Sequence, residues 1–310
     1  MPPPRRAQFV IGMTIVIVLL LYGGQMSRLL TDIEHIEEQP EPCPDITELT
    51  AKPAPGWADI SLYVGSGVFE WQGNKLQKGK PIEPLQSHSQ AGQDVMAASL
   101  NGCKRDGFFV DLAAHHAIEI SNTVLLEALG WTGICIEAMQ EYWWGLAHRT
   151  CKVFGGVIGS EEDEAVRFND MKNGLSGLVG PEYDNKVEQG HPITRHSTRL
   201  DLLLKSAQAP EIIDYLSLDV EGAEMDIMST FPFEEYTIRV TTTERPGVDL
   251  KELFQEHGYI EVREIADFGE VLWVHPSLEG VEGLLTKFRE AELGDLFKRE
   301  LFNECFNVGE

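Results

Sequence analysis

Residues 215–219 read YLSLD, a short apolar run that ends in an acid, which is typical of a buried strand in a parallel sheet. Four more segments have this character: Phe108–Leu112 (FFVDL), Thr132–Glu137 (TGICIE), Cys151–Phe154 (CKVF) and Ile238–Thr243 (IRVTTT). Helix-like stretches lie between the strands, at Ser121–Leu129, Glu141–Arg149, Arg199–Ser206, Glu224–Met228 and Leu250–His257. The alternation predicts an α/β fold, a parallel sheet with helices on both faces.

The last two strand candidates break this alternation. YIEVREI, residues 259–265, and EVLWVHP, residues 270–276, are separated only by ADFG. A link this short requires an antiparallel hairpin. Parallel strands with a C-terminal antiparallel hairpin are the plan of the Rossmann-like class I methyltransferases that use S-adenosylmethionine, although periodicity alone leaves other nucleotide-binding folds open. Ligands of such sheets bind beyond the carboxyl ends of the strands, so functional residues are expected just after Leu112, Glu137, Phe154 and Asp219.

The charge balance argues against one class of partner. The 310 residues contain 50 acids and 25 Lys and Arg residues, for a net charge of −25. Such a surface repels a phosphate backbone, so we expect no nucleic-acid partner.

The N-terminal segment predicts a membrane anchor. Ala7–Ser27 carries no charge, and at about 1.5 Å per residue it reaches the thickness of a bilayer core, about 30 Å. A cleaved signal peptide is the alternative, but YGGQMS, at the end of this uncharged run, offers no clean cleavage site. Arg5 and Arg6 precede the span and an acidic segment follows it, which favours a single-pass type II protein with its domain in the Golgi or ER lumen. The absence of an Asn-x-Ser/Thr sequon is a mild argument against the lumen.

Five cysteines allow at most two disulfides in such an oxidising compartment. Cys135 lies inside an apolar strand pattern and is expected to be a buried free thiol. Cys43 and Cys305 lie in peripheral segments and are candidates for a bridge. No cysteine or histidine cluster has the spacing of a zinc site, and we predict no metal site.

The first strand and the second strand both end in polar residues. Asp111 is followed by a turn of small residues, Ala113–Ala117, which would let a cofactor approach the backbone while the acid fixes its polar end. Glu137 ends the next strand, where an acid accepts ribose hydroxyls in dinucleotide-binding folds. The alternatives are an ordinary strand-to-helix turn and a solvated carboxylate.

Three acids follow the fourth strand, in the segment DVEGAE at Asp219–Glu224. They suit a general base, a set of hydroxyl acceptors for a sugar, or hard ligands for Mg²⁺. An acidic helix N-terminus is the alternative, and it explains Glu224 better than Asp219.

Several motifs together resemble the FkbM-type methyltransferases, particularly eukaryotic members with a membrane anchor. The resemblance extends over about Gln86–Ser277, and its motifs are SQAGQD (89–94), GFFVDLAA, GWTGICIE, DYLSLDVEGAEMDIM, ERP and FGEVLWVHPS. It implies transfer of a methyl group from S-adenosyl-L-methionine to an oxygen, commonly a sugar hydroxyl. The acceptor would then be a glycan or another small molecule with a hydroxyl.

The resemblance also implies residue roles. Asp111 and the loop containing Ala113, His115, His116 and Ala117 would bind the methionine end of the cofactor, and Glu137 its ribose. Asp219 and Glu221 would face the acceptor as the catalytic pair. Ser89, Gln90 and Gln93 would belong to a segment that covers the cofactor, and the glycine-rich Met171–Gly180 resembles a lid, with a plain flexible loop as the alternative.

The chain departs from the family in the cofactor loop. Family members commonly have Gly where this chain has Ala113 and Ala117, and alanine costs little there only if φ is negative. They commonly have Asn or Asp within the pair that is His115 and His116 here. A catalytically inactive methyltransferase fold, serving as a membrane-anchored binding or trafficking module, is therefore the alternative function.

The chain thus divides into four predicted parts. These are a cytosolic tip and transmembrane anchor (1–28), a stem (29–85), an FkbM-like methyltransferase domain (86–278) and a C-terminal helical extension (279–310).

Overall fold

The computed structural model describes residues 61–64, 67–70, 86–147, 149–171 and 175–306. The predicted membrane anchor lies outside these ranges. None of the helices in the described ranges has the length and apolar character needed to cross a bilayer. Inside the predicted stem, β1 (Ser61–Val64) and β2 (Gly67–Glu70) form an antiparallel pair.

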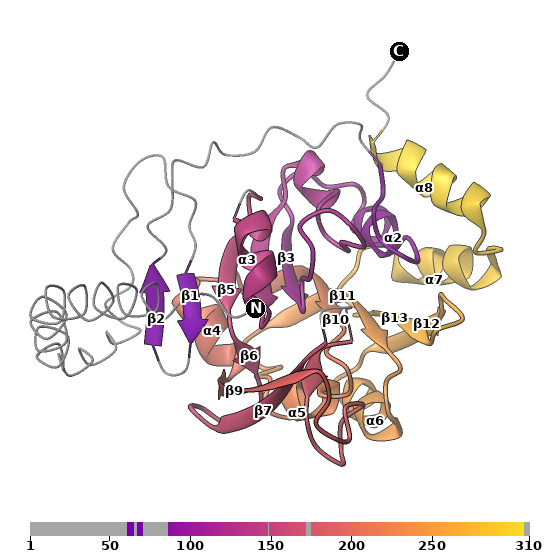
Figure 1. Ribbon diagram of the computed structural model, residues 1–310. Helices are drawn as coiled ribbons and strands as arrows, with labels where there is room; N and C mark the ends of the chain where they lie inside the picture. The colour runs from indigo at the N-terminus through magenta and orange to yellow at the C-terminus, as the bar shows by residue number, and fades with distance from the viewer. Residues whose placement is uncertain (1–60, 65–66, 71–85, 148, 172–174, 307–310) are drawn as a thin grey trace, which may run out of the picture. The chain divides into compact units, whose positions relative to one another are not determined.

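A seven-stranded, mostly parallel sheet forms the centre of the domain (Figure 1). Its spatial order is β12-β13-β11-β10-β3-β4-β5. The parallel members are β3 (Phe108–Leu112), β4 (Thr132–Glu137), β5 (Lys152–Gly155), β10 (Ile212–Leu218) and β11 (Thr237–Glu244). The hairpin of β12 (Ile260–Glu264) and β13 (Glu270–Val274) is antiparallel and ends the sheet, as its short link predicts.

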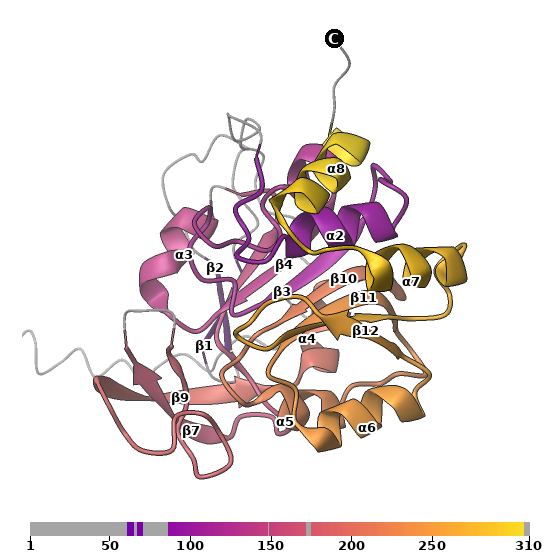
Figure 2. The same ribbon diagram turned by 90° about the vertical axis from the view of Figure 1, so that its right-hand side faces the viewer.

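Two apolar cores cover the two faces of this sheet. Successive side chains of a strand point to opposite faces of the sheet, so neighbouring residues pack in different cores. Phe109 belongs to the core on one face and Val110 to the core on the other. Figure 2 shows the helices on either side. On the Phe109 face lie α2 (Gln93–Leu100), α3 (Gln140–Leu146), α7 (Val281–Glu290) and α8 (Asp295–Phe306), and on the other lie α4 (Leu200–Ser206), α5 (Glu224–Ser229) and α6 (Val248–Glu256).

The segment Ser121–Leu129 differs from the helix that its pattern predicts. Only Leu126–Leu129 is helical, as the 3₁₀ helix η2. The hydroxyl of Ser121 accepts hydrogen bonds from the backbone N–H groups of Thr123 and Val124, at 3.4 and 3.1 Å. This local side-chain contact competes with helical hydrogen bonds, so the first half of the segment is a turn.

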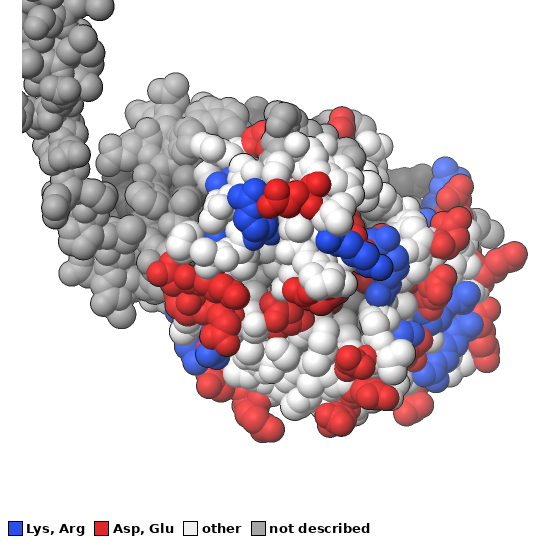
Figure 3. Space-filling model, turned by 60° about the horizontal axis from the view of Figure 1, so that its bottom comes forward, with Lys and Arg blue, Asp and Glu red and all other residues white. Residues whose placement is uncertain are grey.

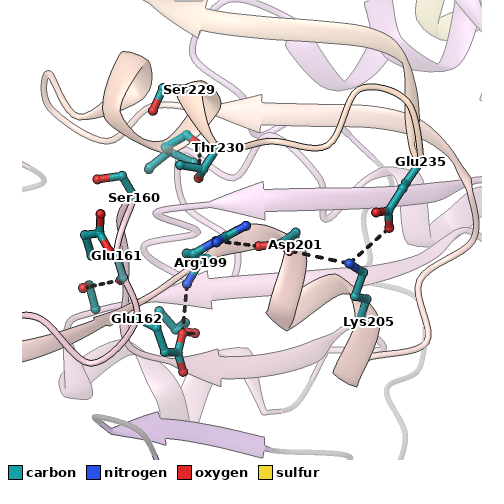
Figure 4. A network of polar contacts seen from close by, with 12 residues as sticks. Ser160, Glu161, Glu162, Arg199, Asp201, Lys205, Ser229, Thr230 and Glu235 are labelled. Carbon is teal, nitrogen blue, oxygen red and sulfur yellow. Dashed lines mark hydrogen bonds and ion pairs between the residues drawn. The ribbon is translucent and has the colours of Figure 1, made fainter.

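A second sheet lies beside α5 and was not predicted (Figure 1). Its order is β6-β9-β7-β8, from β6 (Val157–Ile158), β7 (Ala165–Asp170), β8 (Gly177–Leu178) and β9 (His191–Thr198). The N–H of Ser160, which follows β6, donates to Asp226 of α5 at 3.2 Å and links this region to the main domain. Thr198 of β9 donates to Glu162 at 2.7 Å, and the next residue, Arg199, pairs at 3.0 Å with Asp201 of α4 (Figure 4). Acidic side chains are numerous on the lower face of the domain (Figure 3).

Two disulfides correct the cysteine predictions. Cys135 is bonded to Cys151 and is not a free thiol, because β4 pairs with β5 and brings the two Cα atoms to 5.9 Å. Cys305 is bonded to Cys103 and not to Cys43. This second bridge joins the end of α8 to the segment after α2, two elements that pack against each other. Both bridges connect elements that only the tertiary fold makes neighbours.

Candidate active site

Two adjoining cavities lie at the carboxyl ends of the parallel strands. The smaller has about 450 Å³ of free space and the larger about 920 Å³. Ala113, Glu137 and Ser176 line both, so the two form one elongated hollow. This is the edge of the sheet where the strand order predicts ligand binding.

The smaller cavity is mainly apolar. Residues from the ends of β4 and β5 and from the second sheet enclose it, among them Ile136, Ala138, Val157, Phe168 and Leu178. Glu137 is its only charged lining residue within the described ranges. Such a surface suits a flat, weakly polar group.

The larger cavity is acidic. Its lining includes Asp111, Glu137, Asp219, Glu221 and Glu244, and no described Lys or Arg lines it. Asp111 lies near the carboxyl end of β3, and Asp219 directly follows β10, the parallel neighbour of β3, so the two acids meet at one edge of the sheet. The expected meeting of the four predicted acids in one cleft is thus found, and Glu244, at the end of β11, joins them.

Asp111 is buried beneath the turn that follows β3. It accepts a short hydrogen bond from the hydroxyl of Thr123, and Thr123 in turn accepts one from Arg149 Nη2 at 2.9 Å. Burial raises the pKa of Asp111, while the nearby Arg149 charge opposes that rise.

Glu137 already organises the backbone around it. Its Oε2 accepts the N–H of His115 at 2.7 Å, and its Oε1 accepts the N–H of Met139 at 2.6 Å. Burial raises the pKa of Glu137 to about 7 in spite of these bonds. Each carboxylate oxygen has a second lone pair, so the side chain can still accept the hydroxyls of a ligand.

The acids after β10 and β11 form a compact group. One carboxyl oxygen from each of Asp219, Glu221 and Glu244 lies within 4.8 Å of the others, a spacing that a divalent cation could bridge. Arg245 already contacts two of them, Glu221 at 3.1 Å and Glu244 at 2.7 Å. Burial, and then the neighbouring Glu244, raise the pKa of Asp219 well above its ordinary value and that of Glu221 to about 7. The group is therefore short of positive charge.

Backbone strain concentrates at this cavity. Four of its lining residues other than glycine have positive φ: Ala113 (59°), His115 (50°), Ile120 (55°) and Glu221 (57°). Left-handed conformations cost a residue with a side chain about 1 to 3 kcal/mol and tend to occur at functional sites. Because φ is positive at Ala113, the condition under which alanine would cost little at this position is not met.

The two histidines of the loop, His115 and His116, have different environments. His115 lines the larger cavity and contacts Tyr142, with 4.2 Å between ring centroids. Burial lowers the pKa of His115, so its ring is neutral near pH 7 and places no charge beside a cationic ligand. His116 Nδ1 accepts the N–H groups of Ile118 and Glu119 and closes a turn.

Not every predicted site residue reaches the hollow. His116 and Ala117 line neither cavity, and Ala117 belongs to the apolar core. Glu224, the last acid of the DVEGAE segment, also lines neither cavity: it is buried, and its Oε1 accepts the N–H groups of Val220 and Gly222. These contacts give the three residues local structural roles, and a part in cofactor binding stays a prediction for the two loop residues.

The predicted covering segments do border the hollow. Gln90 and Leu175 line the larger cavity, and Gly177 lines the smaller one. A Cβ atom on Gly177 would lie 2.9 Å from Cβ of Glu221, so glycine permits this close approach. Residues 172–174 of the predicted lid lie outside the described ranges, and its mobility stays a prediction.

No role was predicted from the sequence for four polar residues of the site, Thr123, Arg149, Glu244 and Arg245, although Glu244 and Arg245 begin the motif ERP. Glu244 carries a usable signal, because it directly follows an apolar strand beside the one that ends before Asp219. Arg149 carries none, because it follows a helix and reaches Asp111 only through Thr123.

Comparison with known proteins identifies a family whose model matches this chain. The model of the family described as "Methyltransferase FkbM domain" matches residues 111–275, more than half of the chain. No curated protein matches the sequence. A solved structure, precorrin-6y C5,15-methyltransferase from Geobacter metallireducens GS-15, is similar at 11% identity and a TM-score of 0.32, over 63% of this chain and 91% of that one.

Proposed function

The chain belongs to the FkbM methyltransferase family, and from this premise we propose that it is an S-adenosylmethionine-dependent O-methyltransferase of class I architecture. The strand order, with five parallel strands and a terminal antiparallel hairpin, supports that architecture. A sugar or glycan hydroxyl is the proposed acceptor.

One observation carries the cofactor assignment: the hollow changes character along its length in the order that this cofactor requires. The apolar cavity suits adenine, Glu137 at the junction suits the ribose hydroxyls, and the acidic cavity suits the positively charged methionine end. Several polar atoms of the larger cavity's lining are buried without a hydrogen-bond partner, namely both ring nitrogens of His115, Asn122 Oδ1 and Asp219 Oδ1. Such atoms fit a site that is completed by a polar ligand.

The same acids can serve the acceptor. When bound, S-adenosylmethionine supplies a methyl group on a sulfonium, whose sulfur keeps the bonding electrons as the acceptor oxygen takes the methyl. Asp219 and Glu221 line the acidic cavity, and we propose that the acceptor hydroxyl binds beside them, since their raised pKa values suit groups that take up a proton near neutral pH. Positioning of the nucleophile is expected to supply most of the remaining rate enhancement.

Calorimetric titration of the full-length chain with S-adenosylhomocysteine tests the cofactor assignment. We expect saturable binding by the wild-type chain. Glu137→Ala should weaken it by about tenfold to 150-fold, since one or two hydrogen bonds to a charged group contribute about 1.5 to 3 kcal/mol. Glu137→Gln, which keeps size and one acceptor oxygen, is the matched control and should lose less. No binding by the wild-type chain would reject the enzyme and favour the inactive binding module.

We also propose that the domain lies in the lumen of the Golgi or ER behind an N-terminal anchor. Two disulfides within one domain support an oxidising compartment. Protease treatment of sealed microsomes tests this, and we expect the domain to be protected. Digestion from the cytosolic side would contradict it.

A further inference from the structure

We propose that Arg149 is a positioning residue for the cofactor, acting through Thr123 to hold Asp111 aimed and charged toward the amino group at the methionine end. This inference rests on the proposed function. It assigns a role to a buried cation that lies behind the cavity and does not line it.

Hydrogen bonds connect four side chains in series, from Glu127 to Arg149, Thr123 and Asp111. Glu127 Oε1 accepts Arg149 Nε at 3.1 Å and so fixes the plane of the guanidinium. Arg149 Nη2 donates to Thr123 Oγ1 at 2.9 Å, and Thr123 donates its hydroxyl hydrogen to Asp111 Oδ2. The hydroxyl has one hydrogen to donate, so the guanidinium beside its oxygen orients that hydrogen toward Asp111.

Further contacts fix Arg149 where it stands. Its side chain is buried, Nη1 donates to Ser121 at 3.2 Å, and its Cζ lies 5.8 Å from the centre of the Phe109 ring. Two residues later Cys151 is bonded to Cys135 of β4. A guanidinium held at this many points loses little entropy when it orients a neighbour.

This series of hydrogen bonds from Glu127 to Asp111 matters because the surroundings of Asp111 otherwise favour its neutral form. Burial raises the pKa of Asp111, and Glu127, Glu137 and Tyr215 are titratable groups that also interact with it. Arg149 is the cation that opposes them, while the hydroxyls of Thr123 and Ser217 stabilise the ionised form. Without this support Asp111 would be protonated over a wider pH range and would lose its attraction for an ammonium group.

Two ligands separate positioning of Asp111 from a general structural role. S-adenosylhomocysteine carries the amino acid portion, whereas 5′-methylthioadenosine has the same adenosine and thioether sulfur without it. Thr123→Val keeps the size of the side chain and removes the hydroxyl, and Thr123→Ser is the matched control that keeps it. All binding constants are measured by calorimetry on the full-length chain.

We expect Thr123→Val to weaken S-adenosylhomocysteine binding about tenfold at pH 7 and to leave methylthioadenosine binding unchanged. Its loss should shrink as the pH rises, because Asp111 then ionises without help. Thr123→Ser should behave as wild type. Arg149→Lys, which keeps the charge but not the fork of donors, should reproduce part of the loss if it folds.

Equal weakening of both ligands in Thr123→Val would overturn the inference, since it would reveal a structural role for the hydroxyl. Unchanged binding of both ligands would overturn it as well. Failure of the wild-type chain to bind S-adenosylhomocysteine is a different result, because it rejects the proposed function and the inference falls with it.

Discussion

We predict that replacing Ala113 of the cofactor loop by glycine raises the free energy of unfolding, although most substitutions by glycine lower it. Ala113 has a φ of 59°, a left-handed conformation in which its Cβ atom crowds the backbone. Ala117, four residues later in the same loop, is not among the residues with positive φ. The two alanines therefore provide a matched pair, in which one substitution gives opposite results.

The magnitude follows from two opposing contributions. Removing Cβ from a left-handed residue relieves about 1 to 2 kcal/mol. Glycine also gains freedom in the unfolded chain, which costs about 0.5 to 1 kcal/mol. The free energy of unfolding of Ala113→Gly should thus rise by about 0.5 to 1 kcal/mol. Ala117→Gly has no strain to relieve, and because its methyl group is buried it should lose about 1 to 2 kcal/mol.

Urea unfolding of the full-length chain, followed by tryptophan fluorescence with the disulfides intact, measures both values. Parallel titration with S-adenosylhomocysteine shows whether the relieved loop still binds. If Ala113→Gly destabilises the chain as much as Ala117→Gly does, the left-handed conformation of Ala113 is wrong.

Three further predictions concern the acids and the disulfides. Asp219→Asn should lower turnover by about 100-fold or more, measured with a saccharide acceptor that wild type methylates, and should change S-adenosylhomocysteine affinity little. Unchanged turnover would reject Asp219 as the proton acceptor. Since burial raises the pKa of Glu137 and Glu221 to about 7 from 4.5, the folded chain keeps protons that the unfolded chain releases, so the free energy of unfolding should fall as the pH rises from about 4.5 to 7. Glu221→Gln should flatten that dependence in urea titrations, and a stability that rises over this range would contradict the raised pKa values. Cys305→Ser opens a bridge between residues 202 positions apart and should cost about 2 to 5 kcal/mol in non-reducing urea unfolding, whereas wild-type stability would argue against the bridge.

The order of strands and the chemistry at their ends are properties of the local sequence. A strand such as Phe108–Leu112 is buried on both faces, so it appears as a continuous apolar run, and a four-residue link between the last two strands permits only a hairpin. Parallel strands place their carboxyl ends on one edge, so Asp111, Glu137 and Asp219 are predictable as neighbours from their positions alone. No contact between distant segments has to be known for these conclusions.

Contacts between distant segments were decided by the tertiary structure. The partner of Cys135 depends on how β4 and β5 align, which sequence spacing does not state. In the second sheet β6 and β8 have only two residues each, and β9 (HPITRHST) is mostly polar, so the pattern of these strands resembles loop sequence. Arg149 reaches Asp111 through a hydroxyl in another turn, and the left-handed Ala113 belongs to a loop in which the N–H of His115 donates to Glu137 of the next strand. Sequence patterns report the burial and period of single elements, whereas pairing, strain and relayed hydrogen bonds depend on where elements far apart in the chain meet.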